Sequence, residues 1–276
     1  MLWTPGGRSP NLEDRRSSGG VGRGLGIGGT VVVLALSLLF GRNLFTDLGV
    51  EPAGVNAAST PMTPADSAAQ ETEVQFVSFV VDDVQNTWAN ILPKDGVSFH
   101  PAKLVLFRNS TDSGCGTAQS VMGPFYCPDD ERVYLDLGFF DELKQKFGAS
   151  GDFAQAYVIA HELGHHVQHL LGTDARARQA VDQNPSQANE VSVRIELQAD
   201  CYAGVWAHST DQRRLLQQGD VDEALNAASS VGDDRIQQRT TGRINVDSFT
   251  HGSAAQRSAS FKRGFESGDP RSCNTI

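Results

Sequence analysis

The chain has 276 residues, enough for one substantial domain or for one domain with appended segments. Its formal net charge is −10 at pH 7, and no basic stripe with interleaved aromatic residues occurs, so we expect no nucleic-acid partner. Apolar residues make up 39% of the chain, and its 28 glycines and 11 prolines indicate that some segments lie outside a packed core.

The N-terminal part has the pattern of a membrane anchor that follows an unstructured segment. Residues 1–24 are rich in Gly, Ser and Arg without an apolar period, which predicts a disordered N-terminus. Residues 25–41 carry no charge and are long enough for a short membrane-spanning helix, which we favour over a core helix. Arginines precede this run, which predicts a single-pass protein with a cytoplasmic N-terminus and an extracytoplasmic (periplasmic or extracellular) domain. No cleavage site follows closely, so we expect the anchor to stay attached to the membrane.

The remaining chain predicts a linker and one globular domain. Residues 42–72 contain many Pro, Ala, Ser and Thr and are typical of a linker, so the domain should comprise residues 73–276. A helix that ends before Pro93 and two short strands at 103–107 and 132–135 come first. Further helices are predicted at 138–147, 152–171, 187–209, 220–238 and 253–266. The expected fold class is α+β and predominantly helical, with a small β-sheet and a preceding transmembrane helix.

Four cysteines, Cys115, Cys127, Cys201 and Cys273, all follow the predicted anchor. An even count in an oxidising compartment predicts two disulfides. Proximity in sequence favours the pairs 115–127 and 201–273 among the three possible connectivities, and free buried cysteines are the alternative. The chain has no C-x-x-C pair, so a thiolate zinc site has little support.

The segment 156–172 holds four of the seven histidines of the chain. Its core, His161-Glu162-Leu163-Gly164-His165, is an H-E-x-x-H motif inside a predicted helix. The i, i+4 spacing puts both imidazoles on one helix face, about 6 Å apart along the axis, which suits two ligands of one tetrahedral ion. Glu162 projects roughly 100° around the helix from His161, where a general base beside the open side of the metal is needed.

The other two histidines of this segment fit no such arrangement. His169 lies about 12 Å along the helix axis from His161 and cannot share its metal. His166 points to a different face from both expected ligands. We therefore expect His166 and His169 to face solvent or to lie near the metal centre without binding the ion.

A third metal ligand must come from elsewhere in the chain. The metzincin motif requires Gly and His where this sequence has Gln168 and Leu171, so that possibility fails. Glu196 and Asp200 stand at i, i+4 in an otherwise apolar helical stretch. Glu196 is then the candidate third ligand, and Asp200 the candidate acceptor for the free ring N–H of His161 or His165. A solvated acidic face is the alternative, but buried carboxylates need a partner, and a metal supplies one.

The combination of H-E-L-G-H with E-L-Q-A-D resembles the gluzincin arrangement, and the wider pattern resembles the bacterial "putative neutral zinc metallopeptidase" family. The matching stretches are N-L-E-D-R-R at 11–16, G-P-F-Y-C-P at 123–128, V-Y-L-D at 133–136, Y-V-I-A-H-E-L-G-H-H-V-Q at 157–168, E-L-Q-A-D-C-Y-A-G-V-W-A at 196–207 and F-T-H-G-S-A-A-Q-R at 249–257. The resemblance covers nearly the whole chain. It implies a zincin-like metallopeptidase domain with zinc on His161, His165 and Glu196 and with Glu162 as the base.

These observations predict a membrane-anchored, exported zinc endopeptidase, a hydrolase that acts on a peptide or protein substrate. Its zinc would activate a water in the fourth coordination position, and Glu162 would move the proton. Candidates for a further oxyanion donor are His251, Tyr157, Tyr202 and Arg257. His251 lies in a loop before a helix that Ser253 caps, although a loop histidine is often merely exposed, and packing is the commoner role of buried tyrosines.

Two further expectations concern the substrate and the competing class of protein. By analogy with gluzincin-like folds, the strand at 133–135 would be an edge strand that pairs with an extended substrate. The alternative is a non-catalytic envelope or partner-binding protein with a structural zinc site, and Glu162 separates the two because a closed site has no use for a base. A serine or cysteine hydrolase is disfavoured because the chain has no G-x-S-x-G motif.

Overall fold

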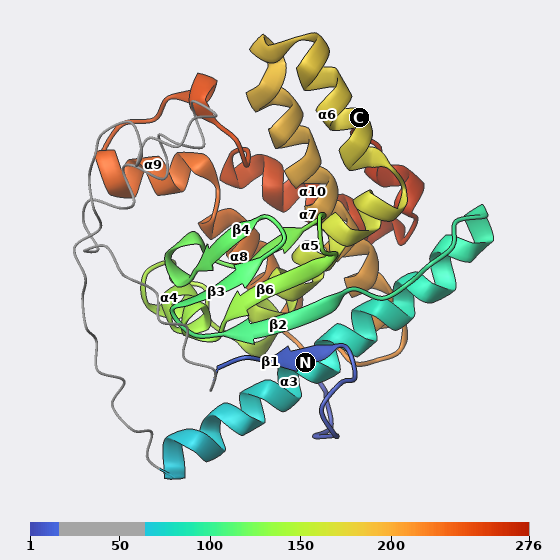
Figure 1. Cartoon of the computed structure of the whole chain (residues 1–276), viewed down its shortest axis with the longest axis vertical. Coiled ribbons are helices and arrows are strands. Elements are labelled where there is room, and N and C mark those ends of the chain that lie inside the picture. The colour runs from blue at the N-terminus through green and yellow to red at the C-terminus, as the bar shows by residue number, and fades with distance from the viewer. Residues whose placement is uncertain (17–63, 276) are drawn as a thin grey trace.

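The structure is a computed structural model that describes residues 1–16 and 64–275 (Figure 1). Its helices are α3 (Pro64–Ile91), α4 (Gly138–Gln145), α5 (Asp152–Leu170), α6 (Thr173–Gln183), α7 (Ala188–Gln212), α8 (Asp220–Ser230), α9 (Asp233–Thr241) and α10 (Ala254–Ser267). Its strands are β1 (Leu12–Asp14), β2 (Lys103–Phe107), β3 (Ser110–Ser113), β4 (Gly116–Gln119), β5 (Phe125–Cys127) and β6 (Arg132–Asp136). Short 3-10 helices are η1 (Leu92–Asp95), η2 (Ser120–Met122), η3 (Pro185–Gln187), η4 (Val246–Ser248) and η5 (Pro270–Cys273).

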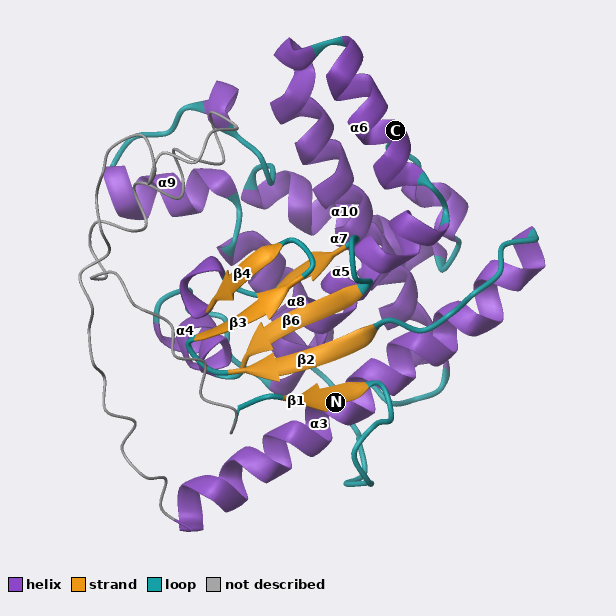
Figure 2. Cartoon of the chain, viewed as in Figure 1, coloured by secondary structure: helices purple, strands orange, loops and turns teal. Residues whose placement is uncertain are grey.

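The strands form a small layer beside a larger body of helices (Figure 2). The main sheet has the order β1-β2-β6-β5, in which β1, β2 and β6 are parallel and β5 is antiparallel to β6. Strands β3 and β4 form a separate antiparallel hairpin. The prediction of a predominantly helical α+β fold with a small sheet is therefore confirmed.

Both faces of the central strands are buried, which explains the unbroken apolar run of β2. Leu104 and Leu106 point into the main core, which they share with α3 and α5. Val105 and Phe107 point to the opposite face, where they pack with Ala118 of the β3–β4 hairpin. The sheet thereby forms a rigid support on which α5 lies.

Helices α7 and α10 cross at very short range because both present glycines at the crossing. An added Cβ on Gly264 would lie 1.9 Å from the backbone oxygen of Cys201. An added Cβ on Gly204 would lie 2.1 Å from the backbone oxygen of Phe261. Only glycine permits this approach of two backbones. The crossing brings the start of α10 next to the middle of α7.

The predicted strands at 103–107 and 132–135 agree with β2 and β6, and four of the five predicted later helices agree with α4, α5, α7 and α10 to within a few residues. The predicted helix 220–238 is instead two helices, α8 and α9, which break at Gly232. A Cβ at Gly232 would lie 2.3 Å from the backbone nitrogen of Ala254, so α10 occupies the space at the break. Helix α6 and strands β1, β3, β4 and β5 were not predicted, because α6 is mostly polar and strands of three or four residues are too short to show an apolar period.

The predictions for the N-terminal part need correction. Residues 25–41, the predicted anchor, lie outside the described residues, as do 42–63 of the predicted linker. The last part of that linker is helical, because α3 begins at Pro64 rather than near Glu73. Within the described ranges, no helix combines the length and the apolar character needed to cross a membrane.

Residues 1–16 are also not a detached, disordered segment. Leu12 of β1 pairs with Leu104 in the main sheet, and Met1 is buried. The ammonium group of Met1 lies 2.6 Å from Asp152, the first residue of α5. An anchor with a cytoplasmic N-terminus would hold these residues on the other side of a membrane from the sheet that they complete. The predicted single-pass anchor, and the membrane localisation that followed from it, are therefore wrong.

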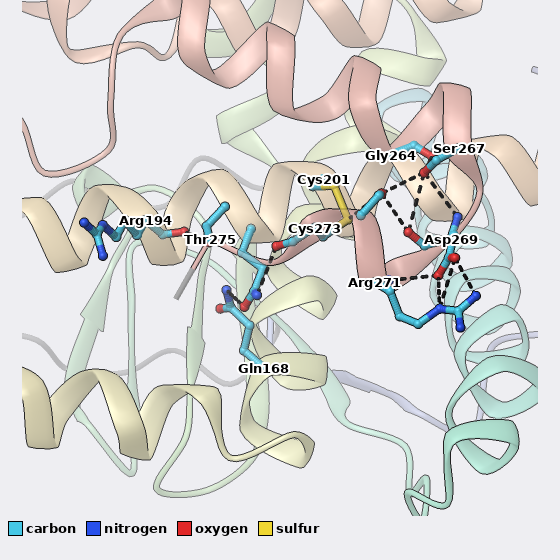
Figure 3. The surroundings of a disulfide bond; sticks show 11 residues. Gln168, Arg194, Cys201, Gly264, Ser267, Asp269, Arg271, Cys273 and Thr275 are labelled. Carbon is cyan, nitrogen blue, oxygen red and sulfur yellow. Dashed lines mark hydrogen bonds and ion pairs between the residues drawn. A yellow bond between two sulfur atoms is a disulfide. The ribbon is translucent and has the colours of Figure 1, made fainter.

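The disulfide prediction is confirmed. Cys115 bonds to Cys127 and Cys201 bonds to Cys273, so the described residues contain no free cysteine. The second bond joins the middle of α7 to the C-terminal segment that follows α10 (Figure 3). A local network around Ser267, Asp269 and Arg271 holds the turn between them, in which Asp269 accepts from the Arg271 guanidinium at 2.7 Å.

Candidate metal centre

Helices α5 and α7 bring the three predicted metal ligands together. The side-chain donor atoms of His161, His165 and Glu196 all lie within 4.8 Å of one another. The Nε2 atom of His161 is 3.2 Å from Oε2 of Glu196, and the Nε2 atom of His165 is 3.6 Å from Oε1. Two residues of one helix and one residue of a second helix thus present two nitrogens and a carboxylate to a common point.

A glycine inside the H-E-x-x-H motif permits this approach of the two helices. A Cβ added to Gly164 would lie 3.1 Å from the backbone oxygen of Ala199 and 3.3 Å from its Cα. That distance is tighter than ordinary contact, so a larger residue would push α7 away from α5. Gly164 therefore helps to place Glu196 within reach of both imidazoles.

The second nitrogen of each imidazole has a hydrogen-bond partner. His161 donates from Nδ1 to Oδ1 of Asp200 at 2.8 Å. His165 donates from Nδ1 to Oε1 of Gln168 at 2.8 Å, and the amide group of Gln168 donates to the backbone oxygen of Ile195. In the neutral form of each ring these bonds place the proton on Nδ1 and leave Nε2 free to bind a metal. Asp200 is thus the partner of His161, and the partner of His165 is a residue that sequence analysis missed.

Asp200 lies at the centre of a buried network below the metal centre. It is fully buried, and it accepts hydrogen bonds from the hydroxyl of Tyr157 and from Nε of Arg257, the latter at 2.9 Å. A second guanidinium nitrogen of Arg257 lies 3.0 Å from the other Asp200 oxygen and 3.8 Å from Glu196. A buried, bidentate ion pair of this kind fixes the orientation of the carboxylate.

Sequence analysis considered Arg257 and Tyr157 only as oxyanion donors or packing residues. Both instead bind Asp200. The helical spacing of the sequence could have indicated that Arg257 is buried, because it shares a face of α10 with the buried residues Ala254, Phe261 and Gly264. A cation on the buried face of a helix requires an anion, and Asp200 provides it.

The charges of the site shift its pKa values in opposite directions. Burial disfavours the imidazolium form, but Asp200 and Glu196 raise the pKa of His161 to about 10. Burial opposes ionisation of Glu196 as well, but the two imidazoles lower the pKa of its carboxyl group well below the usual value. The pKa of Asp200 is also lowered, because Arg257 and His161 outweigh the cost of its burial. Glu196 and Asp200 are therefore carboxylates throughout the neutral range.

The residues present fit a zinc ion. Two imidazole nitrogens and one carboxylate are a ligand set that zinc uses in sites with one open position, and hydrogen bonds to the outer imidazole nitrogens are typical of such sites. The described residues contain one other close group of acids, Asp152, Asp220 and Glu223. That group has no imidazole, and the Met1 ammonium lies 2.6 Å from Asp152 and 3.2 Å from Asp220.

A cleft of about 560 Å³ opens over this centre. His161, His165 and Glu196 form part of its wall, together with Glu162, which is only 8% exposed. His251, which follows α9, lines the same cleft. The predicted base and the predicted oxyanion donor therefore face the same space as the three ligands.

His251 is held in place by Asp233 at the start of α9. One carboxylate oxygen of Asp233 accepts from the backbone N–H groups of Thr250, His251 and Gly252 at 2.7–3.0 Å. The other carboxylate oxygen lies 3.3 Å from Nδ1 of His251. Burial lowers the pKa of His251, but the hydrogen bond to Asp233 and the charge of Glu196 outweigh it, so that the pKa is raised. Sequence analysis did not identify Asp233.

The remaining histidines of the motif segment and Tyr202 contact residues other than the three metal ligands. His166 is 1% exposed, donates from Nε2 to the backbone oxygen of His100 and accepts from Tyr126, so of its two expected positions the solvent-facing one is excluded. Burial lowers its pKa, which keeps the ring neutral. His169 is partly exposed and pairs with Asp174 at 2.8 Å. Tyr202 packs edge-on against Trp88, as expected of a packing residue.

The prediction that the strand at 133–135 is an edge strand is wrong. Strand β6 lies between β2 and β5 and has a partner on each side. The edge of the main sheet beside the cleft is β5, and its residues Phe125 and Tyr126 line the cleft. Sequence analysis did not predict β5, which has only three residues, and without β5 the strand at 133–135 had no expected partner on its outer side.

Comparison with known proteins places the chain among bacterial relatives. It is 47% identical over 284 residues to the uncharacterized protein YpfJ of Escherichia coli strain K12, covering 100% of this chain and 99% of the relative. It is 43% identical over 254 residues to the uncharacterized protein Mb2605 of Mycobacterium bovis, covering 83% of this chain and 84% of the relative. No solved structure matches the chain. The family described as "Putative neutral zinc metallopeptidase" matches residues 1–276, and the chain belongs to this family.

Proposed function

We propose that the protein is a zinc-dependent endopeptidase that hydrolyses peptide bonds of an extended substrate in the cleft over His161, His165 and Glu196. The observation that carries the proposal is the position of Glu162. Its carboxylate lies on the wall of the same cleft as the three ligands but is not one of them. A structural zinc site has four protein ligands and no open position, whereas this centre has three ligands and faces a cleft.

The three ligands would hold zinc, which lowers the pKa of a water and polarises a carbonyl group when bound. Glu162 accepts the proton of the attacking water and delivers it to the leaving amine, so one carboxylate serves as base and then as acid. Asp200 keeps the proton of His161 on Nδ1, and Gln168 does the same for His165. Both rings then keep Nε2 directed toward the metal position while the peptide bond is hydrolysed.

His251 is the proposed donor to the oxyanion that forms at the carbonyl carbon. Its side chain is about half exposed in the cleft, and Asp233 orients the ring through Nδ1. The raised pKa of His251 increases the share of imidazolium, which donates from Nε2 toward developing negative charge. Asp233 acts through His251 and through the loop that it organises.

The backbone of β5 offers a place for the substrate chain. An extended peptide can add to a free sheet edge by main-chain hydrogen bonds that do not depend on its side chains. Gly123, Pro124, Phe125 and Tyr126 line the cleft along this edge. Pairing there would draw the peptide across the metal centre in an extended form.

Substitution of Glu162 tests the proposal. Glu162→Gln keeps the shape of the side chain but cannot accept a proton, so we expect hydrolysis of a peptide library to fall by at least about 100-fold while bound zinc stays near one equivalent. Chromatography of the products and elemental analysis measure the two quantities. Glu196→Ala is the comparison, because it should lose most of the zinc and the activity together.

Full activity of the Glu162→Gln variant would contradict the proposed base. The competing function is a non-catalytic partner-binding protein with a structural zinc site. That function predicts no hydrolysis by the zinc-loaded wild type and equal zinc content in the wild type and the Glu162→Gln variant.

A further inference from the structure

The wall of the cleft includes large apolar side chains that the proposed chemistry leaves unused. They include Phe139 of α4, Phe147 just after α4, Val158 of α5, Val231 at the end of α8 and Ile236 of α9. We call these five residues the apolar pocket. They come from two parts of the chain, α4 with α5 and α8 with α9, and each contributes a large or branched apolar side chain to the wall of one cleft.

The apolar pocket lies next to the metal centre. Val158 precedes His161 by three positions on α5, so the two side chains share a helix face one turn apart. The backbone oxygen of Val231 accepts a long hydrogen bond of 3.4 Å from Arg257, whose guanidinium also lies 3.8 Å from Glu196. A side chain in the pocket would therefore belong to a residue close to the scissile bond.

The walls of the apolar pocket are held in place before any substrate binds. The guanidinium of Arg239 lies 4.7 Å from the centre of the Phe147 ring and donates to the backbone oxygen of Lys146 at 3.0 Å. The same guanidinium donates to the backbone oxygen of Ser230 at 2.5 Å. These contacts join the end of α4 to the end of α8 through α9. Preorganised walls reduce the ordering cost of binding.

The acidic residue that α4 contributes to the cleft wall does not favour a basic side chain. Glu142 of α4 lines the cleft, but its carboxylate is paired with Lys146 at 2.7 Å. Val121 and Met122 of η2 extend the apolar lining, although they are 49% and 44% exposed. Large apolar side chains that stay exposed beside a cleft are typical of a binding surface.

From this arrangement we propose that the protein selects peptides in which a residue next to the scissile bond carries a large apolar side chain, aromatic or branched aliphatic, and that the apolar pocket binds this side chain. The inference rests on the proposed peptidase function for its position beside the scissile bond. Removal of such a side chain from water is favourable, and a charged side chain would lose its hydration without gaining a partner.

Binding and cleavage of one set of peptides test this proposal. The peptides share one sequence and carry Phe, Leu, Ala, Lys or Glu at the residue next to the cleaved bond. Dissociation constants are measured on the zinc-loaded Glu162→Gln protein, and kcat/KM on the wild type. We expect the Phe and Leu peptides to have dissociation constants about 10- to 100-fold lower than the Ala peptide and kcat/KM values higher by a similar factor, with the Lys and Glu peptides weakest in both.

The variant Ile236→Glu places a carboxylate in the apolar pocket. It should lower the preference for Phe over Ala at least 10-fold and improve binding of the Lys peptide. Ile244→Glu is the matched control, because Ile244 is 52% exposed and is not part of the cleft wall. Ile236→Ala, which removes bulk without adding charge, should lower the Phe preference by a smaller factor and covers the case in which the Glu variant does not fold.

The outcomes separate the two proposals. Equal binding of the Phe, Ala and Lys peptides, or a preference that neither Ile236 variant changes, would overturn the apolar pocket as the specificity site. Binding with the expected preference but no cleavage by zinc-loaded wild type would instead contradict the peptidase function and retain the pocket as a binding site for apolar peptide side chains.

Discussion

At the scale of single residues, the charge balance of Asp200 decides how the metal centre is built. The side chain is fully buried and contacts His161, Tyr157 and Arg257. A buried carboxylate is costly unless it is paired, and here the guanidinium of Arg257 offsets that cost while the Tyr157 hydroxyl and the His161 N–H donate to the same carboxylate. Asp200 therefore links the ligand on α5 to the cation on α10.

Substitution of Asp200 by Asn tests this role. The amide retains the shape of the side chain but removes the closest anion of the buried Arg257, which keeps only Glu196 at 3.8 Å, and it weakens the hydrogen bond to Nδ1 of His161. We expect zinc affinity to fall by about 10- to 100-fold, measured by competition with a chromophoric chelator at neutral pH. Asp174→Asn is the matched control, since Asp174 lines the cleft but pairs with His169. Equal zinc affinities of the two variants would contradict the role of Asp200.

At the scale of elements, the crossing of α7 and α10 sets the distance between Arg257 and Asp200. Gly204 and Gly264 let the two backbones meet, and the Cys201–Cys273 bond holds the end of the chain against the same part of α7. The H-E-x-x-H helix touches α7 through Gly164 in a similar way. Three glycines in helix interiors, which lower helix propensity, are thus explained by close packing.

Gly264→Ala tests the close crossing. The new methyl group would lie 1.9 Å from the Cys201 oxygen, which cannot move without displacing α7. We expect the free energy of unfolding in urea to fall by about 3 kcal/mol, because overpacking of a buried contact forces the backbones apart. The control Gly7→Ala has no atom within 4 Å of the added Cβ and should be nearly neutral. A Gly264→Ala protein as stable as the Gly7→Ala protein would show that the helices separate without cost.

At the scale of the whole molecule, strand pairing, an ion pair, a disulfide and hydrogen bonds connect both ends of the chain to the metal centre. Residues 1–16 complete the sheet through β1, and Met1 contacts the first residue of the H-E-x-x-H helix. At the other end, the backbone oxygen of Cys273 accepts from Gln198, which in turn accepts from Gln168, the partner of His165. The C-terminal disulfide is thereby connected to a metal ligand by three hydrogen bonds.

The two disulfides should differ in their contribution to stability. Cys201–Cys273 closes a loop with a sequence separation of 72, and Cys115–Cys127 one of 12. By loop-closure entropy the longer bond stabilises by about 4 kcal/mol and the shorter one by about 3 kcal/mol. Urea unfolding of the two double Cys→Ser variants measures these values. Only the Cys201/Cys273 variant should also bind zinc more weakly, and unchanged zinc affinity would contradict its link to His165.

Much of the candidate site could be predicted from local sequence. His161, Glu162 and His165 follow from one helical motif, and Glu196 with Asp200 from a second, because an i, i+4 spacing already determines which side chains share a helix face. The two disulfides followed from proximity in sequence. The break between α8 and α9 did not, because its cause is the N-terminus of α10 at Gly232, a contact with no local signal.

What the sequence determined by itself was the ligand set and the helices that carry it, since both depend on residues within a few turns of one another. Only the tertiary structure decided that Arg257 balances Asp200, that Gln168 orients His165, that β5 is the edge beside the cleft and that residues 1–16 belong to the sheet. The Arg257–Asp200 pair and the pairing of β1 with β2 join segments distant in the chain, and such contacts depend on how the elements pack rather than on any periodicity within them. The contact of Gln168 with His165 is local, but α7 orients the Gln168 amide group through the backbone oxygen of Ile195 and the side chain of Gln198.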